Sequence, residues 1–407
     1  MCSMKRVIFH IDVNSAYLSW EAVSRLAAGD TVDLREIPAA VGGDIETRHG
    51  VILAKSIPAK KYGIVTGEPV VDALRKCPEL TLVKPHHTMY HEKSRAFIAI
   101  LRQYSDVIEQ FSVDEAFVDM TGTERLFGTP VEAANRIREQ IYREQGFTVN
   151  VGVSSNKLLA KMASDFLKPN RVHTLFPEEM KEKMWPLPVR DLFFVGKAAE
   201  HQLNRIGIRT IGDLAHTDPK ALSSVMKKHG EVLWRYANGI DDSAVEVEPA
   251  DAKGYSNSTT VSFDITNAAD AKSVLRSLTD NVCRRLRRDG ARARTITVQI
   301  RYNDLTRTTH QSALAAATNI TKEIEKAVCQ LFDEMWDKTP IRLLGVSASN
   351  IAKGDEGRQM SLFDTTDYAK LEKLDQAFDS IRSKYGAGAI KRGTDIEKKR
   401  DFIAANI

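Results

Sequence analysis

The chain has 407 residues and a net charge of +4, with 43% hydrophobic and 28% charged residues, an ordinary balance for roughly two to four globular domains. Its four cysteines form no C-x-x-C pair, which argues against a disulfide framework or a zinc site and favours a reducing compartment. No apolar run approaches the ~18 residues of a membrane span, and the first residues do not resemble a signal peptide, so we expect a soluble cytoplasmic protein.

The first expected element is a buried strand over residues 5–13, which carries Asp12 near its end. Asn14 and Ser15 are expected to cap the helix that follows. A carboxylate at the end of a central strand often takes part in ligand chemistry, so Asp12 is either a metal ligand or a helix-capping acid. Tyr17 faces the same region, unless it is a core aromatic residue.

A short helix with a basic side is expected within residues 56–64, after short strands and glycine-rich turns. Pro58 suits the first turn of a helix, because the amide hydrogen that proline lacks has no partner there. Lys60 and Lys61 lie one turn later. They either reach a phosphate or are ordinary exposed lysines.

Two short strands, 106–113 and 116–120, flank the adjacent acids Asp114 and Glu115. Strands this close pair as an antiparallel hairpin, which places both carboxylates at its turn. Neighbouring carboxylates repel each other, so a site that keeps both usually holds a cation, and Mg²⁺ prefers oxygen ligands. The alternative is an acidic turn on a solvated surface.

An amphipathic helix over 130–145, a strand over 147–153 and a second helix over 156–167 are expected next. This order indicates an α/β domain of antiparallel strands with helices on one face. Lys168, at the end of the second helix, either interacts with the helix dipole or reaches phosphates near the carboxylates. The residues expected to face the core from the first helix are Val131, Ala134, Ile137 and Ile141.

Two glycine-containing segments, 194–197 and 207–214, are typical of a helix-hairpin-helix. Glycine lets the amides of a hairpin approach a DNA phosphate closely, without base readout. Gly196 and Lys197 are therefore candidate DNA contacts, unless the segment is a plain helical turn. The polar, acidic stretch over 241–253 is expected to be a linker.

A strand-helix-strand-strand-helix-strand order is expected beyond the linker, as in a ferredoxin-like unit. The expected strands are 256–265, 293–302, 306–314 and 341–349, and the expected helices are 270–288 and 319–336. Residues 272–307 contain ten lysines and arginines against three acids, which points to a polyanion such as nucleic acid. The alternative is a solvated helix face. The candidate DNA-binding residues here are Arg284, Arg285, Arg287, Arg288, Arg292, Arg294 and Arg301.

The sequence becomes polar beyond residue 353, and the apolar side chains within 359–363 stand alone. An isolated apolar anchor either docks into the groove of a partner or packs on its own domain. Residues 366–385 are expected to form a helix.

Taken together, these residues resemble the Y-family, or lesion-bypass, DNA polymerases of bacteria. The resemblance runs from about residue 5 to 363, and its motifs are specific in combination although each is weak alone. They are His-Ile-Asp-Val-Asn-Ser-Ala-Tyr (10–17), Ser-Ile-Pro-Ala-Lys-Lys-Tyr-Gly-Ile (56–64), Ser-Val-Asp-Glu-Ala-Phe (112–117), Val-Gly-Val-Ser-Ser-Asn-Lys (151–157) and Ala-Ser-Asp-Phe-Leu-Lys-Pro-Asn (163–170). The sequence departs from the common family pattern at Ile57, where Tyr is frequent, and at Lys60, where Arg is frequent.

The resemblance implies an α+β right-hand polymerase with several domains. The implied domains are a catalytic palm (1–18 and 78–170), small fingers (19–77), a helical thumb with a helix-hairpin-helix (171–242), a linker (243–253), a ferredoxin-like, DNA-binding little finger (254–350) and a C-terminal tail (351–407).

The resemblance also implies a catalytic site. Asp12, Asp114 and Glu115, with the Val13 carbonyl, would bind two Mg²⁺ ions, and Tyr17 would be the steric gate against a ribose 2′-hydroxyl. The groups that match triphosphate ligands are the side chains of Lys60 and Lys168 and the amides of Ser15, Ala16 and Tyr17 at a helix N-terminus. The matching sliding-clamp peptide spans 359–363, with Gln359, Leu362 and Phe363 as its contacts.

The implied activity is template-directed, low-fidelity DNA synthesis past lesions, in which deoxynucleotides join a primer 3′-hydroxyl by two-metal phosphoryl transfer. The implied partners are primer-template DNA, deoxynucleoside triphosphates and a sliding clamp, with no membrane, and we expect a monomer. Two rival interpretations are a non-catalytic DNA- and clamp-binding repair accessory and a nucleotidyl cyclase. The complete acidic trio argues against the accessory, and the basic unit and the hairpin-helix argue against the cyclase.

Overall fold

The computed structural model describes residues 6–43, 50–248, 251–354, 366–386 and 388–390. The chain forms two compact units. The first comprises Met1–Gly43 and Val51–Pro249, and the second comprises Asp44–Gly50 and Ala250–Ile407. The division after Pro249 falls within the stretch that the sequence predicts as a linker.

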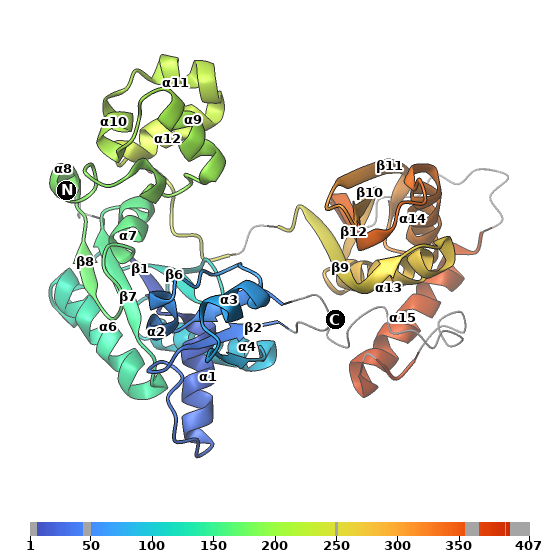
Figure 1. The fold of residues 1–407 in the computed structure, drawn as a ribbon, viewed down its shortest axis with the longest axis horizontal. Coiled ribbons are helices and arrows are strands. Elements are labelled where there is room, and N and C mark those ends of the chain that lie inside the picture. Colours follow the sequence, from blue (N-terminus) through green and yellow to red (C-terminus); the bar gives the residue numbers. More distant parts are fainter. Residues whose placement is uncertain (1–5, 44–49, 249–250, 355–365, 387, 391–407) are drawn as a thin grey trace. The chain divides into compact units, whose positions relative to one another are not determined.

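A five-stranded sheet forms the centre of the first unit, in the order β5-β6-β1-β7-β8 (Figure 1). Every residue of β1 (Ile8–Val13) is buried, as expected for the middle strand of a covered sheet. It pairs antiparallel with β6 (Glu115–Asp119) on one side and with β7 (Val149–Ser154) on the other. The outer strands are β5 (Ile108–Gln110), which completes the predicted acidic hairpin with β6, and β8 (Val172–Thr174), which runs parallel to β7.

Helices cover both faces of this sheet, so the prediction of helices on one face is wrong. The helices α4 (His87–Leu101) and α6 (Pro130–Gln145) share a core with the odd-numbered residues of β1. The helix α7 (Lys157–Ser164) lies on the opposite face, against β1 and β7. It lies so close that a Cβ atom on Gly152 would be 1.9 Å from the Ala160 carbonyl oxygen, so only glycine fits.

The sequence predicts α6 correctly but assigns one of its core residues wrongly. Ala134, Ile137 and Ile141 are buried as predicted, whereas Val131 is 44% exposed. Ala133 is buried in its place. The apolar stripe therefore starts one turn into the helix, and Val131 lies to one side of it, in the first turn.

The helix α1 (Ala16–Ala27) starts where the sequence predicts, but no side-chain hydrogen bond caps it. Ser15, at the N-cap position, has a left-handed backbone conformation with φ 47° and ψ 51°. The Asn14 side chain bonds instead to Asn150 and Thr148. Ser15 therefore occupies the predicted N-cap position, but neither side chain makes the expected capping hydrogen bond. A left-handed residue other than glycine is strained by ~1–3 kcal/mol, and such strain often marks a ligand site.

A second, three-stranded sheet of the first unit has the order β3-β2-β4. Its strands are β2 (Ala39–Gly42), β3 (Ile52–Lys55) and β4 (Thr81–Val83). The short helix predicted around Pro58 is present as α2 (Ile57–Lys61), and α3 (Val70–Lys76) follows it.

The rest of the first unit is helical and has its own apolar core. Its α-helices are α8 (Met180–Lys183), α9 (Lys197–Arg205), α10 (Ile211–His216), α11 (Pro219–Met226) and α12 (Lys228–Ala237), and the short helix α5 (Glu124–Phe127) precedes α6 near the sheet. The two segments of the predicted helix-hairpin-helix correspond to the start of α9 and to the turn that leads into α10.

The second unit has the predicted strand-helix-strand-strand-helix-strand order. Its elements are β9 (Gly254–Ile265), α13 (Ala268–Arg288), β10 (Ala291–Tyr302), β11 (Arg307–Thr318), α14 (Thr321–Met335) and β12 (Ile341–Lys353), and the sheet order is β11-β10-β12-β9. Residues of α13 and α14 share one core with the sheet. The predicted C-terminal helix is α15 (Tyr368–Tyr385). Among the helices in the described ranges, none has the length and apolar character needed to cross a membrane.

Candidate active site

Three acids from distant parts of the sequence meet at one end of the central sheet. Asp12, near the end of β1, lies directly opposite Glu115, the first residue of β6. The amide of Val13 donates a hydrogen bond of 3.0 Å to the Asp114 carbonyl oxygen. The pairing of β1 with β6 therefore brings the backbones of Asp12, Asp114 and Glu115 together.

Two lysines neutralise the facing carboxylates. Lys168 Nζ lies 2.5 Å from Asp12 Oδ2, and Asp12 is only 7% exposed. Lys161 Nζ lies 3.2 Å from Glu115 Oε1 and 3.8 Å from Asp12 Oδ2. Buried carboxylates are costly without a partner, so these ammonium groups stabilise the acids in this structure.

The third carboxylate is directed differently. The Ser112 hydroxyl donates to Asp114 Oδ1 at 2.6 Å. Within the described part of the chain, no three Asp, Glu, His or Cys side chains form a group that could hold a metal ion in this structure. The donor set still fits Mg²⁺, because it offers three carboxylates and a neighbouring carbonyl, which are hard oxygen ligands.

The two facing acids have opposite pKa shifts. Burial would raise the pKa of Glu115, but the neighbouring His10 and Lys161 outweigh it and lower that pKa to about 2. Burial raises the pKa of Asp12 above its usual value, and the Lys168 and Lys161 charges only partly oppose this. Burial would lower the pKa of Lys168, but the Asp12 and Asp165 carboxylates raise it above its usual value, so its ammonium stays charged.

His10 is a site neighbour that the sequence analysis misses. Its side chain is fully buried, with Nε2 3.4 Å from Glu115 Oε2 and Nδ1 2.8 Å from the Ser164 hydroxyl. Burial lowers the pKa of His10, which favours the neutral ring. Its position two residues before Asp12, on the same face of β1, is the signal that could have revealed it.

An amide network holds the loop that carries Lys168. The helix α7 ends at Ser164, three residues earlier than predicted, and the chain then turns back toward β1. Asn150 Nδ2 donates to the Ser164 and Leu167 carbonyls, and Asn14 Oδ1 accepts from the Asn170 amide. These bonds fix both ends of the loop, which keeps Lys168 beside the carboxylates.

A cavity of about 340 Å³ opens beside Asp12. The predicted phosphate-binding residues Ser15, Lys60 and Lys168 line it, whereas Ala16 and Tyr17 do not. The wall also includes Arg35 and Lys55, which the sequence analysis misses. The full lining is Asp12, Val13, Asn14, Ser15, Leu18, Ser19, Arg35, Lys55, Ser56, Ile57, Lys60, Thr148, Lys168 and Pro169.

Tyr17 lies on the side of the site nearest to Asp114. Partial burial and the negative charge of Asp114 raise the pKa of the Tyr17 phenol, so the phenol is neutral near pH 7. The ring is half-buried against aromatic residues of α4 and α1.

The candidate DNA-binding residues lie on several surfaces. Gly196 and Lys197 are exposed at the start of α9 in the first unit. In the second unit, Arg294 and Arg301 are exposed residues of β10. The neighbours of Arg301 in that strand, Ile300 and Tyr302, are buried, so Arg301 is on the sheet face away from the helices.

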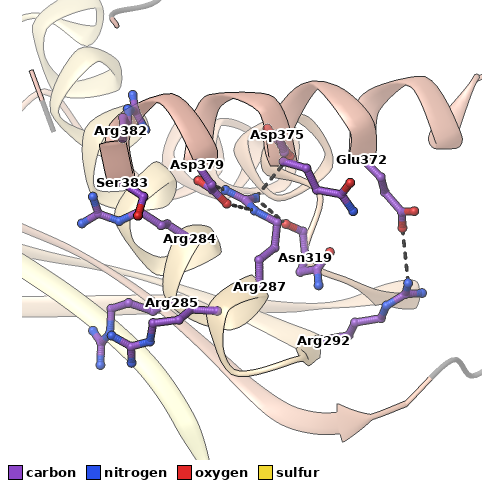
Figure 2. A pocket seen from close by; sticks show the side chains of 12 residues that line it. Arg284, Arg285, Arg287, Arg292, Asn319, Glu372, Asp375, Asp379, Arg382 and Ser383 are labelled. Atoms are coloured by element: carbon purple, nitrogen blue, oxygen red, sulfur yellow. Dashed lines mark hydrogen bonds and ion pairs between the residues drawn. The ribbon is translucent and has the colours of Figure 1, made fainter. Parts of the chain in front are cut away.

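The remaining candidate arginines line a hollow of about 670 Å³ between the end of α13 and α15, in which α15 supplies acids (Figure 2). Arg287 pairs with Asp375 and Asp379, and Arg292 pairs with Glu372 (Figure 2). Of the other arginines that line the hollow, Arg285 donates a hydrogen bond to the Ser256 carbonyl, and Arg288 pairs with Asp289. Arg284 also lines the hollow. The predicted clamp contacts Gln359, Leu362 and Phe363 lie outside the described residues.

Comparisons with known proteins match both units. The impB/mucB/samB family matches residues 11–165, and the C-terminal domain of that family matches residues 252–362. The DNA polymerase IV of Clostridium acetobutylicum is 45% identical over 396 residues, which cover 97% of this chain and 100% of that protein. DNA polymerase IV of Acetivibrio thermocellus is 39% identical, and the alignment covers 96% of this chain and 97% of that protein. DNA polymerase IV 2 of Bacillus subtilis is also 39% identical, and the alignment covers 96% of this chain and 95% of that protein.

A solved structure has the same fold. A Y-family DNA polymerase chimera of Dbh and Dpo4 aligns with a TM-score of 0.72 at 22% identity, and the alignment covers 86% of this chain and 100% of the chimera. The family matches and the near full-length relatives agree with each other and with this fold. The chain therefore belongs to the impB/mucB/samB family of Y-family DNA polymerases.

Proposed function

We propose that this protein, a DNA-directed DNA polymerase by its family, extends primers across damaged template bases by two-metal phosphoryl transfer. The observation that carries the proposal is the cross-strand pairing of Asp12 with Glu115, next to Asp114 and at the mouth of a cavity with basic walls. Adjacent acids supply oxygen ligands, and the basic walls suit a polyphosphate.

Asp12, Asp114, Glu115 and the Val13 carbonyl would hold two Mg²⁺ ions. Such ions, when bound, lower the pKa of the primer hydroxyl and neutralise the leaving pyrophosphate. In this proposal Lys161 and His10 orient the Glu115 carboxylate, since both lie within 3.4 Å of it. To act as a metal ligand, the Asp114 carboxylate would give up its hydrogen bond with the Ser112 hydroxyl.

The cavity beside Asp12 would receive the triphosphate of the incoming nucleotide. Lys168, Lys60 and the amide of Ser15 line the cavity and would bind the phosphates. The amides of Ala16 and Tyr17 do not line it, but as first amides of α1 they have no intrahelical acceptor and would donate to phosphate oxygens that extend past the cavity wall. Tyr17 would exclude a ribose 2′-hydroxyl, since its ring stacks on Tyr90 of α4 and its phenol is within electrostatic reach of Asp114.

The remaining parts of the chain would hold DNA and a clamp. In the proposed division, the palm (1–18 and 78–170), fingers (19–77) and thumb (171–242) are followed by a linker (243–253), a little finger (254–350) and a tail (351–407). Arg301, which is exposed on the sheet face away from the helices, is a stronger candidate for contacts with DNA phosphates than Arg287, which is paired with acids of α15. We also propose that the segment 359–363 binds a sliding clamp and that the protein acts as a monomer.

Primer extension with the full chain tests the function. We expect Mg²⁺-dependent extension of a primer on intact DNA and on templates that carry an abasic site or a bulky base adduct. Asp114→Ala should abolish extension, while Asp106→Ala, which removes an exposed acid just before β5, should leave it unchanged. Normal extension by Asp114→Ala would refute the site, and arrest at every lesion would refute the lesion-bypass class.

A further inference from the structure

The cavity beside Asp12 contains a second lysine from the β3–α2 segment, Lys55. Lys55 and Lys60 line the side of the cavity formed by β3 and α2, and Asp12 and Lys168 line the side formed by β1 and the loop after α7. All four residues belong to the first compact unit, so their arrangement does not depend on the placement of the second.

The fold fixes the backbone that carries Lys55. Lys55 is the last residue of β3, and the preceding residue Ala54 is buried, so alternation directs the two side chains to opposite faces. The next residue, Ser56, is 2% exposed and caps α2, since its hydroxyl accepts a 3.0 Å hydrogen bond from the Ala59 amide. The same hydroxyl donates to the Ile37 carbonyl at 2.7 Å. Lys55 therefore extends from a rigid corner.

The cations of this cavity differ in their ion pairing within the described ranges. Lys168 is paired with Asp12, and Arg35 is paired with Asp33. In contrast, neither Lys55 nor Lys60 takes part in an ion pair within the ranges that the structure describes, and the hydrogen bond of Lys55 Nζ is to the neutral Thr66 hydroxyl at 3.1 Å. Burial and then the charge of Lys60 lower the pKa of Lys55, and the charge of Glu68, which is itself paired with Lys76, opposes this lowering only in part. A multivalent anion bound in the cavity would add negative charge beside both lysines.

We propose that Lys55, together with Lys60, binds the polyphosphate of the incoming nucleoside triphosphate. A single phosphate between Lys168 and the metal-ligand acids would leave both lysines uncompensated, whereas an extended chain of phosphates supplies oxygens for each ammonium. The inference rests on the proposed function, and it adds a nucleotide-binding residue that contacts substrate and takes no part in proton transfer.

Nucleotide titration tests this role without turnover. The full chain is bound to primer-template DNA whose primer ends in a dideoxynucleotide, and dATP or dAMP is titrated opposite template dT in MgCl₂. We expect Lys55→Ala to raise the dissociation constant of dATP about tenfold and that of dAMP less than twofold, because a charge-assisted phosphate contact is lost. Lys55→Arg should retain most of the dATP affinity.

The matched control is Lys61→Ala. Lys61 is an exposed lysine of the same helix as Lys60, but it does not line the cavity. This control should leave dATP affinity unchanged. With an extendable primer, Lys55→Ala should raise KM for dATP about tenfold and change kcat little, since it removes binding common to ground and transition states.

Several outcomes would overturn the inference. Binding of dATP by Lys55→Ala as tight as by Lys61→Ala would show that Lys55 makes no contact. An equal loss of affinity for dATP and dAMP, or a loss of affinity for DNA, would show that Lys55 does not bind the polyphosphate. An unfolding midpoint measured for each variant separates loss of binding from loss of fold, and Lys55→Arg keeps the test valid if Lys55→Ala is unstable. If the unsubstituted protein extends primers and Lys55→Ala binds dATP as tightly as Lys61→Ala, only this inference fails. If the unsubstituted protein extends no primer, the proposed function fails.

Discussion

The ring of Tyr17 stacks on the ring of Tyr90, with 4.5 Å between the centroids and 11° between the planes. Tyr90 is fully buried, and its hydroxyl donates a 2.6 Å hydrogen bond to Glu21 Oε1, which also lies 2.8 Å from His86 Nδ1. Tyr90 therefore supports the ring of Tyr17, and in the proposed steric gate it would limit how far that ring can move away from a sugar.

This support leads to a prediction about sugar selection. Tyr17→Ala should raise the use of ATP relative to dATP at least tenfold, because it removes the ring itself. Tyr90→Leu should raise it by a factor of about 2 to 10, since an aromatic pair contributes ~0.5–1.5 kcal/mol. The measurement is the ratio of kcat/KM for dATP and ATP. Tyr142→Leu, at an exposed position on α6, is the control, and unchanged selectivity in Tyr17→Ala would remove the gate role.

A second prediction concerns the lysine between the two acids. Lys161→Met should lower the free energy of unfolding by ~2–4 kcal/mol without Mg²⁺, because Asp12 and Glu115 then face each other with less compensation. Addition of Mg²⁺ should stabilise this variant more than the unsubstituted protein. Urea unfolding with and without MgCl₂ measures both effects. Lys157→Met, which breaks an ion pair with Glu109, should gain nothing extra from Mg²⁺. An equal gain in both variants would argue against cation binding at these acids.

A third prediction concerns the attachment of α15 to the second unit. Asp375 is 4% exposed, lies 3.2 Å from Arg287 Nη1 and accepts a 2.8 Å hydrogen bond from the Thr321 amide. Asp375→Ala leaves a buried amide and a weakened arginine pair, so we expect a loss of ~3 kcal/mol in unfolding free energy. Asp333→Ala breaks an exposed pair with Lys272 and should cost less than ~1 kcal/mol. Equal losses in the two variants would contradict a structural role for Asp375.

A fourth prediction concerns DNA binding by the open face of the second sheet. Arg301 lies directly opposite Arg307 on the neighbouring strand, and both are exposed. Like charges in register are destabilising, so this arrangement suits a polyanion ligand. Arg301→Ala and Arg307→Ala should each reduce the slope of log DNA affinity against log salt concentration by about 1. Arg276→Ala, which removes an arginine paired with Glu325 on the helical face, is the control for fluorescence-anisotropy titrations. An unchanged slope for Arg301→Ala would exclude that residue.

The sequence predicts the helices and strands better than the side-chain contacts of the site. Periodicity identifies β1, α6 and the second unit because their apolar residues alternate or repeat every three to four positions. The meeting of Asp12 with Glu115 is implied only by the resemblance to Y-family polymerases, because periodicity does not show which strands pair. Lys161 and Lys55 were missed because each lies in an ordinary helix or strand, and only tertiary packing shows which groups they face. Arg287 was predicted to contact DNA because it lies in a basic stretch of the sequence. The acids with which it pairs, Asp375 and Asp379, are about ninety residues away along the chain.

The direct contact between Gly152 and the backbone of α7 has a consequence for how the site is kept in register. Where side chains separate a helix from a sheet, their volumes set the spacing, and substitutions shift it gradually. Here main chain touches main chain, so the spacing has a hard lower limit, and Lys161 and Lys168 are carried on a support that side-chain changes elsewhere hardly alter. The balance of charge around the acids is thereby protected from sequence drift in the surrounding core, and the protection depends on one residue that has no side chain at all.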